Sequence, residues 1–377
     1  MNRQTITRLF GAVCLASIVF SVYVIQHKTL LTTAASARSE CWPLFFASPS
    51  SSSSSSSERS PLSALSSTFS VTSLPSPSPP PPSPSLSLEN ASSKPPTQSS
   101  NSFTRVLCVY FTGRLGNELF EYASTLGLAL TLKRLPVFLG SQYLPFTLTS
   151  FNQTSASFSR FQNRCKLSAR ASEVSCCKFE EKLTRLNSSQ DFTIGLYLQS
   201  YRYFQDHEAV IRQTLTFTDE IRSESSKVVQ ELRQNHSTSP LIGVHVRRGD
   251  LASEPNRKLG YPQVSSDYLN RSMAFFRSRY PDCVFVVGSD SPEWCKENIL
   301  SGHHVHYLTA HSPAVDMHVL SSLDHTVITF GTFSWWIGFF NAGTTVYMKD
   351  FIVNGSWLGG AFNPDGMDYI YPGWIPL

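Results

Sequence analysis

The stretch LIGVHVRRGD, residues 241–250, is the most informative part of this chain. Its first six residues are almost continuously apolar, the pattern of a strand buried on both faces of a parallel sheet. His245 is costly in such a strand unless it has a partner. Arg247, Arg248 and Asp250 follow at once, and ligands of open α/β sheets bind beyond the carboxyl ends of strands. The stretch therefore predicts a parallel α/β fold with a binding site at this point.

Strands and helices alternate on both sides of this strand. We expect further strands at 105–111, 136–139, 194–198, 284–287, 326–330 and 344–348, and helices at 118–133, 219–233, 265–279, 314–323 and 334–340. This alternation is typical of doubly wound parallel sheets. The stretch 140–190 has no clear pattern. The folded region, 105–377, is long enough for two such lobes facing each other.

The first 104 residues do not resemble a folded domain. Leu9–Ile25 is an apolar run without a charge, close to the shortest length that spans a bilayer. Arg3 and Arg8 precede it, which predicts a cytoplasmic tail at 1–8 and an uncleaved type II signal anchor at 9–25. The alternative is a signal peptide cleaved after Ala37, but the apolar run is longer than the usual one.

Residues 26–104 are rich in serine and proline and are expected to form a disordered lumenal stem. Such a composition buries too little apolar surface to offset the entropy of ordering the chain. Six N-x-[ST] sequons agree with a lumenal location and are candidate N-glycosylation sites: Asn90, Asn152, Asn187, Asn235, Asn270 and Asn354.

Composition excludes several classes of protein. The net charge of +4 and the pI near 8.6 are too mild for a nucleic-acid partner. A hydrophobic content of 41% excludes a mostly disordered chain, and a single long apolar run excludes a multi-span transporter. The eight cysteines are too sparse for a disulfide scaffold and form no C-x-x-C zinc pattern.

Gly113-Arg114-Leu115-Gly116-Asn117 lies between an expected strand and an expected helix. Glycines there would let the backbone approach a ligand, and the helix N-terminus offers free amides and a partial positive charge. The alternative is a tight turn with an exposed arginine. The pattern is not G-x-G-x-x-G, so the dinucleotide fingerprint is not met.

Thr332-Phe333-Ser334 opens another helix after a strand. Ser334 and the first helical amides can hold a diphosphate, or the hydroxyls can simply cap the helix. Asp316, on the preceding helix, can bond a base or ribose; the alternative is a solvated helix charge. Arg247 and Arg248 can bind phosphate, or form a surface ion pair with Asp250.

No D-x-D occurs in the chain. A transferase that holds a sugar nucleotide through Mn²⁺ or Mg²⁺ needs neighbouring carboxylates, so we expect the arginines to neutralise the diphosphate without a metal or other cofactor. The histidines 303, 304, 306 and 311 lack the spacing of metal ligands and are expected to belong to a polar surface loop.

The chain resembles the galactoside α-1,2-fucosyltransferases. The resemblance is carried by GRLGNELFEYAS (113–124), LIGVHVRRGDL (241–251) and the stretch 312–347. The H-x-R-R-x-D pattern alone is less specific, because core α-1,6-fucosyltransferases and protein O-fucosyltransferases resemble it there. Glu118 stands where the family usually has glutamine.

The resemblance implies a Golgi type II membrane enzyme with a GT-B-like fold of two facing Rossmann-type lobes. About 105–235 would be the acceptor side and about 240–360 the GDP-fucose side. It implies an inverting, metal-independent transfer of fucose from GDP-β-L-fucose to the 2-hydroxyl of a terminal β-galactoside. Two alternatives are a different acceptor, either a protein or the N-glycan core, and an inactive sugar-binding homologue.

The same resemblance implies the site residues. Arg247 or Arg248 would hold the β-phosphate of GDP, with Asp250 either the base or the ion-pair partner that orients Arg248. Catalytic roles are thus expected for Arg247, Arg248, Asp250 and Asn117. Donor contacts are expected from Gly113, Arg114, Leu115, Gly116, His245, Asp316, Thr332, Phe333 and Ser334.

Overall fold

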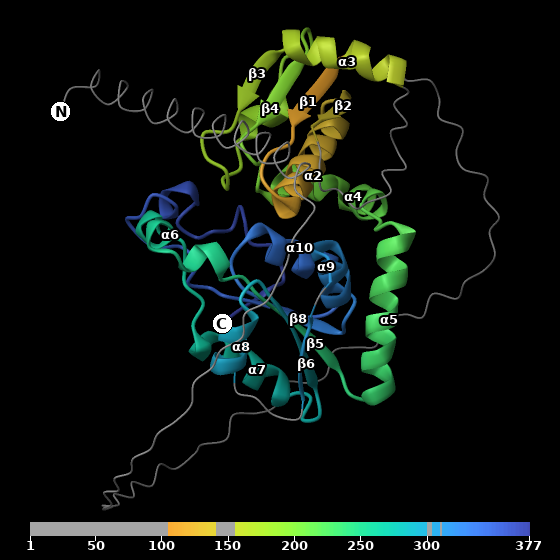
Figure 1. Cartoon of the computed structure of the whole chain (residues 1–377). Coiled ribbons are helices and arrows are strands. Elements are labelled where there is room, and N and C mark those ends of the chain that lie inside the picture. Colours follow the sequence, from red (N-terminus) through yellow and green to blue (C-terminus); the bar gives the residue numbers. More distant parts are fainter. Residues whose placement is uncertain (1–104, 141–154, 300–303, 310) are drawn as a thin grey trace, which may run out of the picture. The chain divides into compact units, whose positions relative to one another are not determined.

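The structure is a computed structural model that describes residues 105–140, 155–299, 304–309 and 311–377 (Figure 1). The expected tail, the anchor at 9–25 and the stem lie outside the described residues, as do Asn90, Asn152 and His303. Within the described ranges, no helix is both long enough and apolar enough to cross a membrane.

The first part of the described chain forms a four-stranded parallel sheet with the strand order β2-β1-β4-β3. Its strands are β1 (Val106–Tyr110), β2 (Leu135–Leu139), β3 (Ala169–Ser172) and β4 (Phe192–Gly195). β1 pairs with β2 on one side and β4 on the other, so its first four residues are fully buried. This central position explains why the β1 sequence is almost continuously apolar.

Two helices cover opposite faces of this sheet. Leu107 packs in one apolar cluster with residues of α2 (Leu115–Thr131), and Cys108 packs in another with Cys165 of α3 (Ser155–Leu167). Successive strand residues face opposite sides, so the two clusters lie on the two faces. A Cys108–Cys165 disulfide joins α3 to β1, a pairing that the sequence left open.

The second part forms a six-stranded parallel sheet with the order β10-β9-β8-β5-β6-β7. Its strands are β5 (Leu241–Val246), β6 (Val284–Ser289), β7 (Val305–Tyr307), β8 (His325–Ile328), β9 (Thr345–Tyr347) and β10 (Ile375–Pro376). β5 lies at the centre between β6 and β8, and all six of its residues are buried. The strand predicted for 241–246 is confirmed.

The remaining helices of the described chain follow β4. They are α4 (Glu208–Thr214), α5 (Asp219–Asn235), α6 (Glu254–Leu259), α7 (Ser266–Arg277), α8 (Pro292–Asn298), α9 (Pro313–Ser321) and α10 (Thr332–Phe340). α7 to α10 contact the second sheet, whereas α4 contacts α2 of the first part. A Cβ on Gly243 would lie 2.7 Å from the carbonyl oxygen of Leu320, so glycine lets α9 lie directly on β5. α5 packs against α9 (Figure 1), so it belongs with the second sheet although the sequence placed it in the first lobe.

The predicted α/β fold with parallel sheets is confirmed, and two expectations change. The segment 194–198 was expected to be a strand, but β4 ends at Gly195 and the next three residues have left-handed backbone. The stretch 140–190, which had no clear pattern, contains α3, β3 and a 3₁₀ helix at Glu181–Arg185.

Candidate active site

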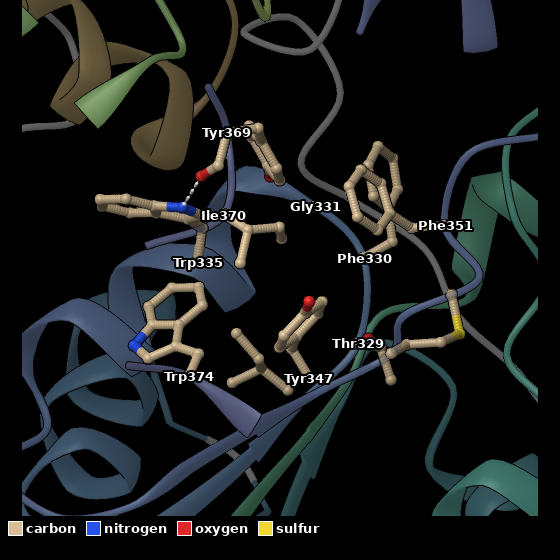
Figure 2. Close-up of a pocket in the computed structure, with 11 residues that line it drawn as sticks. Thr329, Phe330, Gly331, Trp335, Tyr347, Phe351, Tyr369, Ile370 and Trp374 are labelled. Carbon is tan, nitrogen blue, oxygen red and sulfur yellow. Dashed lines mark hydrogen bonds between the residues drawn. The ribbon is translucent and has the colours of Figure 1, made fainter. Parts of the chain in front are cut away.

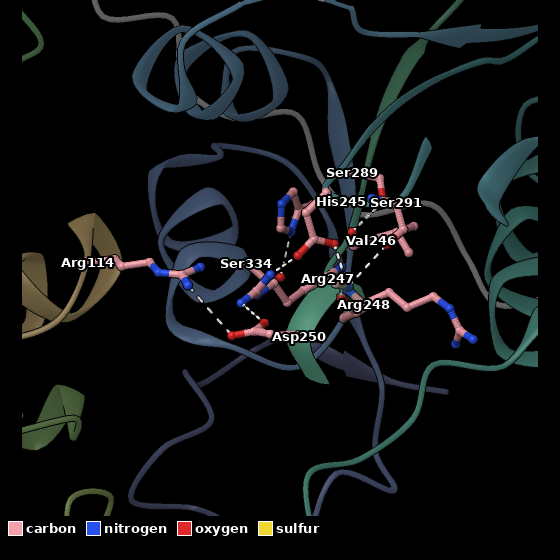
Figure 3. Close-up of polar contacts among 12 residues, drawn as sticks. Arg114, His245, Val246, Arg247, Arg248, Asp250, Ser289, Ser291 and Ser334 are labelled. Atoms are coloured by element: carbon pink, nitrogen blue, oxygen red, sulfur yellow. Dashed lines mark hydrogen bonds and ion pairs between the residues drawn. The ribbon is translucent and has the colours of Figure 1, made fainter. Parts of the chain in front are cut away.

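Arg247 lies at the carboxyl end of β5 and is held from two sides (Figure 3). Its backbone N–H donates to the hydroxyl of Thr329 at 2.8 Å, just beyond β8. Its guanidinium pairs with the carboxylates of Asp250 and Asp290. The side chain is only 21% exposed, and this burial lowers its pKa while Asp250 raises it. A positive charge is thus fixed at the strand end.

Asp290 is a site residue that sequence reasoning missed. Its Oδ1 accepts the backbone N–H groups of Arg248 and Gly249 at 2.8 and 3.0 Å. A Cβ on Gly249 would lie 2.5 Å from Asp290 Oδ2, so only glycine leaves room for this carboxylate. Asp290 directly follows β6, the neighbour of β5, so the rule about carboxyl strand ends could have found it.

Arg248 points away from Arg247 and its carboxylates (Figure 3). Its guanidinium carbon lies 4.4 Å from the centroid of the Trp294 ring on α8, a cation–π contact. The expectation that Asp250 orients Arg248 is wrong. Asp250 pairs with Arg247, three residues earlier, because the 3₁₀ turn Gly249–Ala252 brings its carboxylate back to that side.

His245 and Ser334 form a buried contact next to Arg247. His245 Nδ1 and Ser334 Oγ are 2.7 Å apart, and the ring of Phe333 lies 4.9 Å from the imidazole. Burial and the charge of Arg247 lower the pKa of His245 to about 3, so the ring is neutral at physiological pH. Ser334 is fully buried, which disagrees with the expected direct contact between its hydroxyl and a diphosphate. The pair instead joins the start of α10 to β5.

Arg114 reaches the same place from the first sheet. It follows β1, and its Nη2 lies 3.7 Å from Asp250 Oδ2 (Figure 3). The Arg114 side chain is 76% exposed. Gly113 before it has φ +87°, a left-handed turn that favours glycine. The carboxyl ends of β1 and β5, and therefore of the two sheets, meet at this pair of charges.

Gly116 and Asn117 join the two sheets rather than expose backbone to a ligand. A Cβ on Gly116 would lie 2.6 Å from the backbone nitrogen of Phe333, and the Trp336 indole donates to the Gly116 carbonyl at 3.1 Å. Asn117 Oδ1 accepts the hydroxyl of Thr332 at 2.9 Å. Leu115 is buried as well. The first turns of α2 and α10 are therefore packed together.

Both of these helix N-termini lack a side-chain cap in the described part of the chain. α2 begins after Arg114, whose side chain bonds no first-turn amide, and α10 begins after Gly331, which has no side chain to do so. The hydroxyl of Thr332 donates to Asn117 instead of capping α10. Each terminus carries partial positive charge, which adds to that of Arg247 and Arg114.

Two carboxyl groups on α2 are buried. Glu118 is 2% exposed, away from the solvent-facing rim. Glu121 accepts the backbone N–H and the hydroxyl of Thr112 at 2.8 and 2.6 Å, and so holds the loop that carries Arg114. Burial raises the pKa of Glu121 to about 7.

Asp316 is not part of this cluster. In the first turn of α9, its Oδ1 lies 3.4 Å from His311 Nδ1, and burial raises its pKa. None of the contacts of the described residues links it to Arg247. His306 Nε2 lies 2.8 Å from His236 Nε2, and the described ranges contain no group of three or more His, Cys, Asp or Glu arranged to hold a metal.

A small apolar cavity lies beside the cluster, next to the end of β8 (Figure 2). Its walls include Phe330, Trp335, Phe351 and Trp374, and the Trp335 indole donates to the carbonyl of Tyr369 at 2.7 Å. Its volume of about 20 Å³ has room for about one water molecule. The charged rim at Arg247, rather than this cavity, is therefore the candidate site.

Four candidate glycosylation asparagines lie in the described residues. Asn187, Asn235 and Asn354 are exposed, while Asn270 on α7 is half-buried. Their use stays a prediction.

Comparison with known proteins identifies the family. The model of glycosyl transferase family 11 matches residues 86–375. A galactoside alpha-(1,2)-fucosyltransferase 1 of Leontocebus fuscicollis is 31% identical, over 76% of this chain and 78% of that protein. A galactoside alpha-(1,2)-fucosyltransferase 2 of Pongo pygmaeus is 30% identical, over 67% and 74%. Among solved structures, the fucosyltransferase NodZ from Bradyrhizobium has a TM-score of 0.40 and 16% identity, over 62% and 91%. The chain belongs to glycosyl transferase family 11.

Proposed function

We propose that this protein transfers L-fucose from GDP-β-L-fucose to the 2-hydroxyl of a terminal β-galactoside on glycoproteins or glycolipids. Family membership and the names of the relatives support this reaction. The observation that carries it is the guanidinium of Arg247, fixed by Asp250 and Asp290 at the carboxyl edge of the second sheet. A diphosphate leaving group requires such a fixed positive charge.

The charges suit an inverting displacement. The acceptor oxygen forms a bond to C1 of fucose on the face opposite GDP, while the bond between C1 and the phosphate oxygen breaks. The electron pair leaves with GDP, and Arg247 stabilises the charge that develops there, supported by the partial positive charge of the α10 N-terminus. The acceptor hydroxyl loses its proton. The half-exposed carboxylate of Asp250 orients Arg247 and is our candidate to receive that proton.

We propose that no metal takes part. Arg247, Arg114 and two helix N-termini supply positive charge where other transferases use a divalent cation. We also propose that the two sheets are the lobes of a GT-B fold, the first facing the acceptor and the second holding GDP-fucose. The meeting of Arg114 with Asp250 supports this arrangement.

We further propose a single-pass type II location in the Golgi membrane, with the catalytic part in the lumen. The apolar run at 9–25 after Arg3 and Arg8 supports it. N-terminal sequencing of the mature protein tests the anchor: an intact N-terminus is expected, and a mature start at Arg38 would show that the segment is a cleaved signal peptide.

The test of function is a transfer assay with GDP-fucose and three kinds of acceptor: terminal β-galactosides, N-glycan cores and unmodified protein. The expected product carries fucose α-linked to O2 of galactose, established by linkage analysis. Transfer to protein or to the core would support the alternative acceptors instead. Galactoside binding without transfer would identify an inactive homologue.

A further inference from the structure

Three consecutive residues after β4 have an unusual backbone. Leu196, Tyr197 and Leu198 have φ values of +73°, +71° and +51°, and none is glycine. The Leu198 N–H donates to the Leu196 carbonyl at 2.9 Å, which makes Tyr197 the centre of a three-residue turn. Side-chain-bearing residues adopt this left-handed turn rarely and with strain. Such strain persists only where the surrounding structure imposes it, and it is concentrated at functional sites.

Neighbouring segments hold the strained corner at residues 196–198 in place. The Leu198 N–H also donates to Glu173 Oε1 at 2.8 Å, and the Ser124 hydroxyl donates to the Leu198 carbonyl at 2.8 Å. The next residue, Gln199, donates to the Cys176 carbonyl through its N–H and to Asn117 Oδ1 through its amide. Leu198 is fully buried, so it anchors the corner from within.

The anchored corner presents apolar side chains outward. Leu196 is 54% and Tyr197 37% exposed, although both are large and hydrophobic. Their exposure is not that of a loose loop, because the hydrogen bonds of Leu198 and Gln199 fix the backbone on the C-terminal side. An exposed ring on a fixed backbone is suited to binding, since little loop entropy is lost when a ligand arrives.

The corner borders the candidate active site. β4 lies parallel to β1, with Ile194 opposite Val109. Tyr197 and the loop that carries Arg114 therefore both follow the carboxyl ends of adjacent strands. The half-buried Tyr261 belongs to the segment that follows α6, on the side of the second sheet. Burial raises the pKa of Tyr261 most; the nearby Tyr197 and Asp250 raise it further and Arg247 lowers it, so Tyr197 lies within electrostatic range of the same tyrosine as the two charged site residues.

We infer that Tyr197 is the acceptor platform, on which the ring of the acceptor sugar stacks beside Asp250 and Arg247. This inference rests on the proposed function and names the residue that orients its acceptor. One face of β-galactose is lined by C–H groups, and binding sites for small molecules commonly pair such apolar surface with aromatic rings. With that face on Tyr197, the hydroxyls of the sugar are left for the charged groups.

The test compares Tyr197→Ala and Tyr197→Phe with the wild-type protein. Tyr280→Ala is the matched control, because its ring stacks on His325 at the opposite, amino-terminal edge of the second sheet. The measurements are KM for methyl β-galactoside, KM for GDP-fucose, the Kd of GDP by calorimetry, and Tm.

Loss of the ring should raise the acceptor KM about tenfold and leave the Kd of GDP unchanged. Phenylalanine keeps the ring face, so its acceptor KM should stay within about twofold of wild type. Tyr280→Ala should change neither KM.

Three results would overturn the inference. In an active enzyme, a wild-type acceptor KM for Tyr197→Ala refutes the platform and leaves fucosyl transfer standing. A rise in both KM values with a lower Tm would show that Tyr197 only supports the fold. A wild-type protein that binds GDP but fucosylates no galactoside refutes the proposed function and this assignment together.

Discussion

Replacing Arg247 with alanine should remove most of the transfer activity and leave a folded protein. The guanidinium is the one group of the cluster that both faces the site and is fixed by two carboxylates, Asp250 and Asp290. Alanine removes the positive charge that we assign to the leaving diphosphate. It also leaves two negative charges at the place where the diphosphate would lie.

The size of the effect can be set from the structure. Loss of one preorganised group that stabilises transition-state charge costs about 2.7–4 kcal/mol, or roughly 10²–10³ in kcat. The ion pairs are partly buried, with side chains 21% and 30% exposed for Arg247 and Asp290. Their loss should therefore destabilise the fold by about 1–2 kcal/mol, between the values for surface and buried pairs. Asp290 keeps its two backbone donors, which limits the damage.

Two further substitutions, Arg247→Lys and Arg248→Ala, serve as comparisons for Arg247→Ala. Arg247→Lys keeps a charge but cannot bond two carboxylates and a phosphate with a planar fork, so we expect only partial rescue. Arg248→Ala removes a cation–π contact with Trp294 worth about 0.5–1 kcal/mol. It should lower Tm by about 1–4 °C and change kcat/KM by less than about threefold.

The assay is the initial rate of fucose transfer to a β-galactoside at varied GDP-fucose, with Tm measured for every variant. The expected order of kcat/KM is wild type, then Arg248→Ala, then Arg247→Lys, then Arg247→Ala. The reasoning is refuted if Arg247→Ala folds normally and transfers at a rate near wild type. A larger loss for Arg248→Ala than for Arg247→Ala would refute the assignment of the two side chains.

Three further outcomes are expected. The pKa of Glu121 is raised to about 7, so the folded protein holds this proton more tightly and loses stability as pH rises from about 4.5 to 7; Glu121→Gln should remove that part of the fall in Tm, and parallel Tm curves would contradict it. Cys108→Ser opens the bridge to Cys165, 57 residues away, and should lower the free energy of unfolding by about 4 kcal/mol, measured by denaturant titration; an unchanged midpoint under oxidising conditions would contradict this. Transfer activity should survive exhaustive dialysis against EDTA, whereas complete loss restored by Mn²⁺ would show that the arginines do not replace a metal.

Local sequence was sufficient for the central strands and for part of the site. The apolar runs at β5 and β1 predict these strands, because a central parallel strand is buried on both faces and its own sequence is therefore continuously apolar. Arg114, Arg247 and Asp250 follow from their positions after those strands, since the carboxyl ends of parallel strands share one edge. Family motifs in 113–124 and 241–251 supplied the expected reaction.

Other features depend on partners far away in the chain. Which arginine faces the site was undecided in the sequence, because it depends on Trp294 attracting one and on Asp290, 43 residues beyond Arg247, holding the other. The glycine loop was expected to approach a ligand, but Gly116 serves the packing of α2 on α10.

The corner at Tyr197 is the clearest case of a structure that local sequence does not predict. Its apolar residues predict the end of a strand, since tyrosine has a high β propensity. The left-handed turn instead arises because Glu173 bonds the backbone of Leu198 from 25 residues earlier. The buried strands and the charged residues at their ends can thus be predicted from sequence, because periodicity and composition are local properties. The directions of those side chains depend on the folded chain, because hydrogen bonds and ion pairs between distant segments outweigh local preference.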